Sequence, residues 1–260
     1  MKITSPKNPQ IKTLKQLQSK SKCRVKDQCF VVEGVREIEM ALKFGYKFLK
    51  IYIAEGLYQH RIQFSKQTEI IQVSEEVYEH LAYRSSTEGI IGLVESPSNH
   101  LKTLNFKRKN PLVLVLETPE KPGNIGAVLR TADAAQVDAV IIANPKTDLY
   151  NPNTIRASLG AIFSTPLAIG SSEEVYQYLT DLEFHIFAAT LQNSNSYLKE
   201  SYQISTAFIM GSEAKGLSSF WRDKPNIKAI NISMLGEIDS MNLSVSTAIL
   251  TFEAVRQRRR

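Results

Sequence analysis

Residues 112–116 read Leu-Val-Leu-Val-Leu, and this run decides the fold class of the 260-residue chain. A continuous apolar run without polar alternation is typical of a parallel strand that is buried on both faces of its sheet. Helical and strand patterns alternate after it. The expected helices span 124–135, 153–159, 172–179 and 242–256, and the expected strands span 139–143, 184–189, 207–210 and 227–232. This alternation predicts an α/β fold with a parallel sheet covered by helices.

The residues before this run predict a second, smaller domain. Strand patterns at 30–32, 48–53, 69–73 and 90–94 alternate with helical patterns at 35–44 and 74–81. We therefore expect a small α/β domain over residues 28–96. Residues 97–110 lack periodicity and are the expected linker to a domain over 111–260. Residues 1–27 are expected to form a basic helical arm with a thin apolar stripe at Ile11, Leu14 and Leu17.

The charge of the chain favours a nucleic-acid partner. The net charge is +6, and eight lysines and arginines but no acidic residue precede Asp27. Further basic clusters lie within 102–109 and 256–260. Such clusters attract phosphate backbones through counterion release, which we favour over the alternative of merely solvated tails. Charge alone does not distinguish RNA from DNA.

Several other classes of protein find no support in the sequence. No apolar stretch is long enough to span a bilayer, and the first residues lack the apolar core of a secretory signal. Cys23 and Cys29 do not have a metal-binding spacing and are expected to be unpaired thiols in a reducing cytoplasm. The histidines are isolated, so no metal site is expected. They are His60, His80, His100 and His185.

Three polar segments follow predicted strands, at the edge of a parallel sheet where ligands bind. They span residues 117–133, 208–217 and 232–246. In the first, Arg130 points away from the apolar stripe of its helix and is available to a substrate or a partner subunit. Each segment alone also fits an ordinary turn or a capped helix, with Asn124 or Ser240 as the N-cap. None is a dinucleotide fingerprint, a Walker A loop or a serine-hydrolase elbow.

Taken together, the three segments resemble the motifs of the SpoU (TrmH-type) family of RNA 2′-O-ribose methyltransferases, in the SPOUT superfamily. Motif one is Asn124–Ala134, motif two Gly211–Gly216 and motif three Ile232–Val245. Residues 27–96 resemble the RNA-binding domain of the family more loosely. The resemblance implies a parallel α/β fold with a deep C-terminal trefoil knot, S-adenosylmethionine as cofactor, and a homodimer whose active site draws on both subunits.

The resemblance also assigns site residues. The positions that match cofactor-binding residues are Leu191, Gly211, Ile232 and Met241. The positions that match catalytic or substrate-positioning residues are Asn124, Arg130, Glu213, Ser240 and Asn242. The chain departs from the family pattern at Gln136 and Ala214, where glycine is usual, and at Met241, where leucine is usual. These departures affect the shape of the cofactor loop more than the proposed catalytic side chains.

The chemistry of 2′-O-methylation fits these side chains. A ribose 2′-hydroxyl must lose its proton as it attacks the methyl group, and no histidine lies near the motifs to act as base. A guanidinium group is a poor base, so Arg130 is expected to stabilise the developing alkoxide or to bind the adjacent phosphate. Asn124 and Glu213 would orient Arg130, and Ser240 and Asn242 would position ribose or phosphate. Whether Arg130 itself acts as the base stays open.

The RNA substrate and two alternative functions also stay open. Ribosomal RNA is favoured over transfer RNA because the domain layout resembles that of the rRNA-modifying family members. A non-catalytic RNA-binding or ribosome assembly factor could keep the same fold, although the retained polar residues argue against it. A nucleotide-dependent oxidoreductase is suggested only by the alternation of strands and helices, and a shared fold does not establish function.

Overall fold

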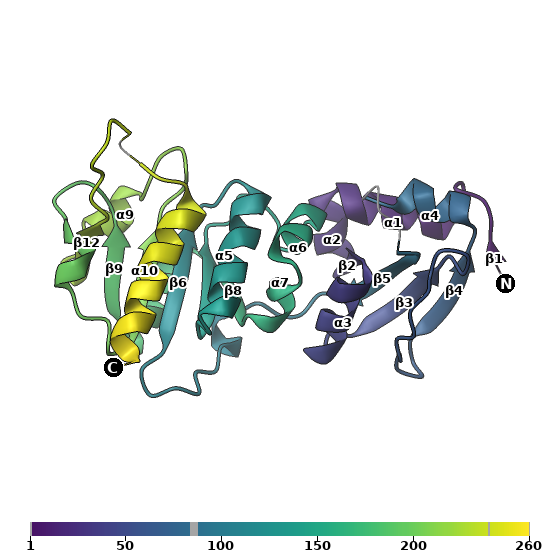
Figure 1. Ribbon diagram of the computed structural model, residues 1–260, viewed down its shortest axis with the longest axis horizontal. Helices are drawn as coiled ribbons and strands as arrows, with labels where there is room; N and C mark the ends of the chain where they lie inside the picture. The colour runs from purple at the N-terminus through teal and green to yellow at the C-terminus, as the bar shows by residue number, and fades with distance from the viewer. Residues whose placement is uncertain (1, 84–87, 239, 260) are drawn as a thin grey trace. The chain divides into compact units, whose positions relative to one another are not determined.

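Two units, each built on its own β-sheet, make up the protein in a computed structural model that describes residues 2–83, 88–238 and 240–259 (Figure 1). Unit 1 combines the residues up to Pro97 with Asp148–Ser164. Unit 2 combines Ser98–Thr147 with Thr165–Arg260. Within the described residues, no helix has both the length and the apolarity needed to cross a membrane.

Unit 1 contains a mixed five-stranded sheet in the order β1-β4-β3-β5-β2. The strands are β1 (Lys2–Ile3), β2 (Cys29–Glu33), β3 (Phe48–Ile53), β4 (Glu69–Val73) and β5 (Ile90–Glu95). The helices are α1 (Pro9–Ser19), α2 (Ser21–Asp27), α3 (Val35–Lys43), α4 (Glu75–Leu81), α6 (Pro152–Ser158) and α7 (Ala161–Ser164). Strand β4 runs parallel to β1 and β3, and β5 runs antiparallel to β3 and β2.

Residues 2–27 pack into unit 1, whereas the sequence pattern predicts a basic helical arm over 1–27. Strand β1 pairs with β4, and helix α1 buries Ile11, Leu14 and Leu17, each no more than 1% exposed. The side chain of Asn8 caps α1 by accepting a hydrogen bond from the amide of Gln10 at 2.9 Å. The apolar stripe thus fixes this helix against the sheet, while basic residues occupy its other faces.

The segment Asp148–Ser164 also belongs to unit 1, although the sequence pattern had placed it in the second domain. Arg24 pairs with Asp148, and the ring of Tyr150 stacks on that of Phe30 with centroids 4.2 Å apart. Helix α6, expected at 153–159 within the larger domain, is therefore part of unit 1.

Unit 2 confirms the predicted parallel sheet. Its seven strands all run parallel, in the order β10-β12-β9-β11-β6-β7-β8. They are β6 (Leu112–Glu117), β7 (Ala139–Ala143), β8 (Leu167–Gly170), β9 (His185–Ala189), β10 (Asn195–Ser196), β11 (Thr206–Met210) and β12 (Ile227–Asn231). The apolar run at 112–116 forms the buried interior strand β6, between β11 and β7.

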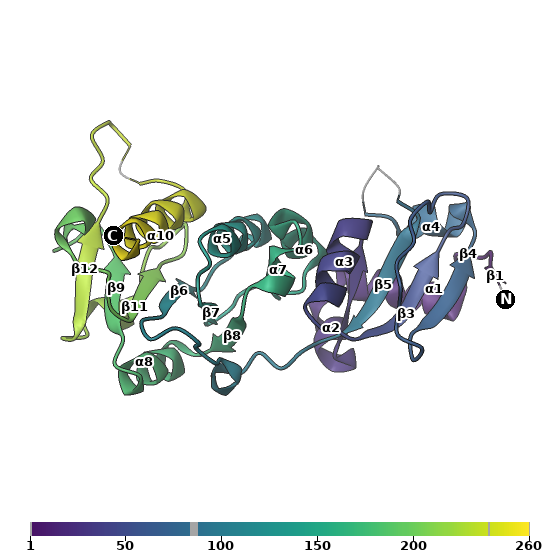
Figure 2. The ribbon, with the colours of Figure 1, turned by 60° about the horizontal axis from the view of Figure 1, so that its bottom comes forward.

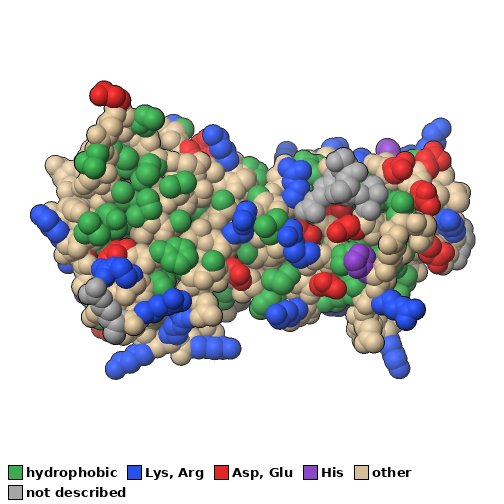
Figure 3. Space-filling model, viewed as in Figure 1, with side chains coloured by type: hydrophobic (Ala, Val, Ile, Leu, Met, Phe, Trp, Pro, Cys, Tyr) green, Lys and Arg blue, Asp and Glu red, His purple; other side chains and the backbone are tan. Residues whose placement is uncertain are grey.

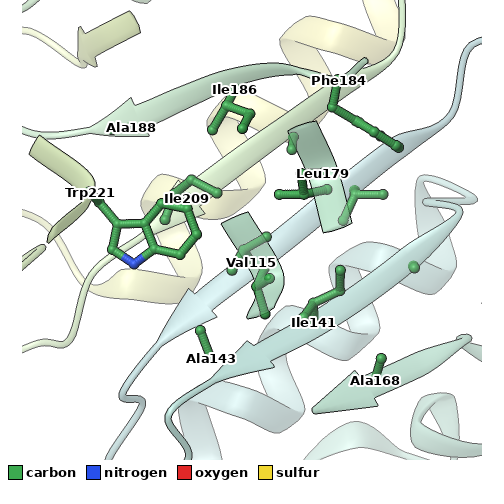
Figure 4. Close-up of a cluster of buried hydrophobic side chains, with 14 of the residues drawn as sticks. Val115, Ile141, Ala143, Ala168, Leu179, Phe184, Ile186, Ala188, Ile209 and Trp221 are labelled. Carbon is green, nitrogen blue, oxygen red and sulfur yellow. The ribbon is translucent and has the colours of Figure 1, made fainter. Parts of the chain in front are cut away.

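Helices cover both faces of this sheet (Figure 2). Helices α5 (Pro122–Ala134) and α10 (Leu243–Arg258) pack together on one face. Helices α8 (Ser172–Asp181) and α9 (Ser219–Arg222) lie on the other face, where Leu179 and Trp221 join Val115, Ile141 and Ile209 in a buried apolar cluster (Figure 4). Two 3₁₀ turns, η1 (Leu101–Thr103) and η2 (Tyr197–Lys199), complete the unit.

The helix ends differ from the sequence-based expectation. The N-cap of α10 is Asn242 and not Ser240, because the Asn242 side chain accepts a hydrogen bond from the amide of Ser244 at 2.9 Å. Helix α5 begins at Pro122, so Asn124 lies inside its first turn and is not its N-cap. The side chain of Asn124 is therefore available for contacts with other segments.

Candidate active site

Three neighbouring strands of unit 2 end at the same edge of the sheet, and a predicted cofactor residue follows each of them. Leu191 comes two residues after β9, Gly211 directly after β11, and Ile232 directly after β12. The sheet order places β9 between β12 and β11. The carboxyl edge of a parallel sheet is the usual ligand-binding edge, so the topology gathers these three positions where a cofactor would bind.

Side chains from all three motifs form one chain of hydrogen bonds. The amide nitrogen of Asn124, on α5, donates to Oε1 of Glu213 in the loop after β11. The amide nitrogen of Asn242 donates to Oδ1 of Asn124 at 3.2 Å. Asn242 also caps α10, so this chain ties the start of α10 to the first turn of α5.

Glu213 retains an unused acceptor at this position. Its Oε2 atom is buried and, among the described residues, has no hydrogen-bond partner. A buried carboxylate oxygen without a donor is costly, which makes this atom a candidate contact for a bound group. The chemistry of the site thus fits a ligand that carries positive charge or hydrogen-bond donors.

The loop that carries Glu213 folds tightly back on itself. Ser212 and Gly216 exchange backbone hydrogen bonds of 3.1 and 2.9 Å. A β-carbon on Gly211 would collide with the backbone of Gly216 and Leu217, and Gly216 has a φ of +65°. Space excludes a side chain at Gly211, and the left-handed backbone conformation favours glycine at Gly216, so the tight loop explains both glycines.

Among the described residues, Arg130, Leu191 and Met241 do not join this hydrogen-bonded chain. Arg130 is exposed on α5 and, within the described ranges, makes no hydrogen bond or ion pair. The structure therefore does not show Asn124 or Glu213 orienting Arg130 within one chain. Ser240 is exposed in the segment before α10, Met241 is half-buried, and Leu191 is 57% exposed.

Positive charge surrounds the start of motif one. Lys146 donates to the Glu120 carboxylate at 2.6 Å, and this contact lowers the pKa of Glu120. The charges of Lys146, Lys215 and Lys121 lower the pKa of Glu120 further. Three lysines around one carboxylate leave a net positive region beside the site, as the approach of a phosphate backbone requires.

A second polar cluster lies at the carboxyl ends of β6 and β7, and none of the three sequence motifs includes it. It centres on Glu117, which is 3% exposed and accepts hydrogen bonds from Ser218 and Ser172. One feature of the sequence indicates this cluster: Glu117, an acidic residue, is the last residue of an otherwise apolar strand.

Proteins of known structure share this fold. A crystal structure of an RNA 2′-O ribose methyltransferase is similar over the full length of both chains, with a TM-score of 0.81 and 35% identity. An AdoMet-bound rRNA methyltransferase from Sinorhizobium meliloti has a TM-score of 0.88 and 25% identity, covering 98% of this chain and 97% of the other. The architecture is thus that of RNA methyltransferases.

Sequence comparison identifies the family. The family model described as SpoU rRNA Methylase matches residues 111–252, and the model of the MRM3-like substrate binding domain matches residues 8–92. The chain belongs to the SpoU rRNA methylase family, which confirms the resemblance of the three motifs. The 23S rRNA (guanosine(2553)-2′-O)-methyltransferase RlmP of Bacillus subtilis (strain 168) is 28% identical over 252 residues, covering 96% of this chain and 97% of RlmP.

Proposed function

We propose that this protein is an S-adenosylmethionine-dependent ribosomal RNA 2′-O-ribose methyltransferase. The observation that carries the proposal is the hydrogen-bonded chain of Glu213, Asn124 and Asn242, which joins the three family motifs at the ligand-binding edge of the sheet. The names of the relatives support it: RlmP is a 23S rRNA 2′-O-methyltransferase, and the Sinorhizobium meliloti protein is an rRNA methyltransferase with bound AdoMet.

The residues present fit S-adenosylmethionine. Gly211 and Ile232 would hold it through backbone groups at the ends of β11 and β12, with Leu191 and Met241 at its border. Two features support this placement. The backbone at Gly211 carries no side chain that would keep a ligand away, and the buried Oε2 of Glu213 has no hydrogen-bond partner among the described residues. When bound, the cofactor supplies an electrophilic methyl group on a cationic sulfur.

The chain's own side chains would then bind and orient the ribose. Asn242 and Ser240 lie at the start of α10, and we assign them to positioning the ribose or its phosphate. Asn124 would hold Glu213 and Asn242 in fixed positions relative to each other, because it forms a hydrogen bond with each. Arg130 would stabilise the alkoxide as the 2′-hydroxyl loses its proton, or hold the neighbouring phosphate, because a guanidinium donates hydrogen bonds and does not accept them.

We propose that Arg130 acts on the site of a partner subunit. Its side chain makes no hydrogen bond or ion pair in the described ranges, and it lies on α5, the helix that packs against α10. Helix α10 exposes Val245 and Phe252, each 48% exposed, and apolar side chains appear on this face of unit 2 (Figure 3). An apolar face beside an unpaired arginine supports a homodimer with shared active sites.

We also propose that the C-terminal segment passes through a loop to form the deep trefoil knot implied by the family resemblance. The parallel strand order and the packing of α10 on α5 support this threading. Unit 1, which matches an MRM3-like substrate binding domain, would bind the RNA through its basic surface. A ribosomal RNA substrate implies a cytoplasmic location.

The identity of the RNA is tested by methyl transfer to separated RNA classes. Purified protein, labelled S-adenosylmethionine and total RNA from cells that lack this protein should give label in ribosomal RNA. Label found only in transfer RNA would show that transfer RNA, and not ribosomal RNA, is the substrate. Absence of transfer together with absence of cofactor binding in calorimetry would favour a non-catalytic RNA-binding protein.

A further inference from the structure

Glu117 is a buried carboxylate for which the proposed reaction gives no role. It ends the apolar interior strand β6 and is 3% exposed. No lysine or arginine among the described residues forms an ion pair with it. Burying a carboxylate is unfavourable unless hydrogen bonds replace its water, so its contacts indicate what it stabilises.

The contacts of Glu117 lead to Ser218, at the end of the loop that carries Glu213, and to Ser172 at the start of α8. Its Oε2 accepts a hydrogen bond from the amide of Ser218 at 2.8 Å, and its Oε1 accepts one from the Ser218 hydroxyl at 2.6 Å. Its Oε1 also accepts one from the hydroxyl of Ser172, at the start of α8, at 3.3 Å. Ser172 in turn accepts hydrogen bonds from Asn144 at 2.9 Å and from the indole of Trp221 at 3.2 Å.

The strongest of these contacts fixes the end of the loop that would hold the cofactor. We call residues 211–218 the cofactor loop. Ser218 is held by both of its hydrogen bonds to Glu117, and Leu217 before it is 6% exposed in the apolar cluster. Gly216 and Leu217 lie against Gly211 so closely that no β-carbon fits between them. The position of Ser218 therefore sets the space beside Gly211.

We propose that Glu117 is a positioning residue that fixes the cofactor loop in the position that binds S-adenosylmethionine. This inference rests on the proposed function, because it assigns the loop to that cofactor. Glu117 itself would not touch the cofactor. It would act through Ser218 and the backbone of residues 216–217, and the Ser172–Trp221 branch would hold its carboxylate in place.

The substitution Glu117→Gln tests this role with little change in side-chain volume. A glutamine has one acceptor oxygen where the carboxylate has two. If that oxygen faces the Ser218 amide, the NH₂ group takes the place of the oxygen that accepted from the hydroxyls of Ser218 and Ser172. The NH₂ group can only donate, and the Ser172 hydroxyl already accepts two hydrogen bonds, from Asn144 and Trp221. At least one hydrogen bond is lost, so we expect the Kd for S-adenosylmethionine, measured by calorimetry on the full chain, to rise about tenfold. The KM for this cofactor should rise with it, while the KM for RNA stays within about twofold.

Thr206→Val is the matched control. Thr206 is fully buried, and its hydroxyl donates to a backbone carbonyl at 2.7 Å, but it lies at the opposite, amino end of β11. This variant should lower the thermal unfolding temperature without changing the Kd for the cofactor. Trp221, the only tryptophan of the chain, gives a further readout. Its fluorescence should shift in Glu117→Gln and stay unchanged in Thr206→Val.

The outcomes are distinct. A cofactor Kd in Glu117→Gln that changes no more than in Thr206→Val overturns the inference. If Glu117→Gln does not fold, Ser218→Ala decides: it removes one hydroxyl from an exposed residue, and a Kd that does not rise by about threefold overturns the inference. If the unaltered protein binds no S-adenosylmethionine, the proposed function itself is wrong, and this inference is wrong with it.

Discussion

Asn124 is the residue on which the candidate active site depends most directly. Its amide group donates to Glu213 and accepts from Asn242, so one side chain connects all three motifs. The sequence resemblance identified each of these residues. It did not predict the order of their contacts, because hydrogen bonds between segments 89 and 118 residues apart depend on how α5 and α10 pack.

Asn124→Ala should abolish this connection and leave the fold intact. We expect kcat to fall by about a hundredfold, comparable to the loss of a positioning hydrogen bond at an active site, with a change in unfolding free energy of only about 1 kcal/mol. Single-turnover methyl transfer and urea unfolding measure the two effects. The control is Asn226→Ala in unit 2, where the asparagine side chain bonds only Tyr176 among the residues that the structure describes. Equal loss of activity in both variants would contradict the assignment.

Among the elements, helix α1 shows how charge can mislead a sequence-based prediction. Its lysines suggest a basic arm distinct from the small domain, but its narrow apolar stripe is buried within unit 1. Apolar spacing indicates which face is buried, yet it does not show what that face contacts. Strand β8 was missed for a related reason: it has only four residues after Pro166, too few for a clear pattern. By contrast, β6 and α10 were predicted, because their apolar patterns are longer.

Leu14→Ala should therefore destabilise unit 1. Removing a fully buried leucine side chain costs about 3 kcal/mol, whereas Lys12→Ala on the exposed face of the same helix should change stability by about 0.5 kcal/mol or less. Urea unfolding followed by circular dichroism measures the difference. Equal, small effects of both substitutions would show that α1 does not pack in solution. The cofactor Kd should be unchanged in both variants, because the proposed cofactor site lies in unit 2.

The contact between α1 and β3 also predicts a pH dependence. Tyr52 of β3 donates to Gln10 of α1 at 3.2 Å, and burial raises the pKa of Tyr52 to about 12. Unfolding returns this phenol to its ordinary pKa near 10. The contribution of Tyr52 to the free energy of unfolding is therefore fully present below about pH 10. It falls by roughly 2–3 kcal/mol as the pH rises towards about 12. Tyr52→Phe should show a shallower decline in urea midpoint above pH 10. A decline as steep as that of the unaltered protein would contradict this cause.

At the scale of the whole molecule, the exposed Arg130 predicts that active sites are shared between two chains. Arg130→Ala and Asn124→Ala should each be almost inactive alone. After subunits exchange at equal concentrations, half of the dimers combine one chain of each kind, and each of these contains one intact site. Mixing should therefore restore about a quarter of the activity of the unaltered protein. Tagged subunits verify that exchange has occurred. If exchange occurs but activity does not recover, Arg130 acts in the active site of its own chain.

The most direct test of the central claim is the position of the transferred methyl group. Ribosomal RNA methylated with labelled S-adenosylmethionine is digested with alkali, which cleaves RNA only where the 2′-hydroxyl is free. A methyl group on that oxygen blocks cleavage, so the account predicts that the label is recovered in alkali-resistant dinucleotides. Label recovered in mononucleotides would mean that a base is methylated, and it would contradict the account.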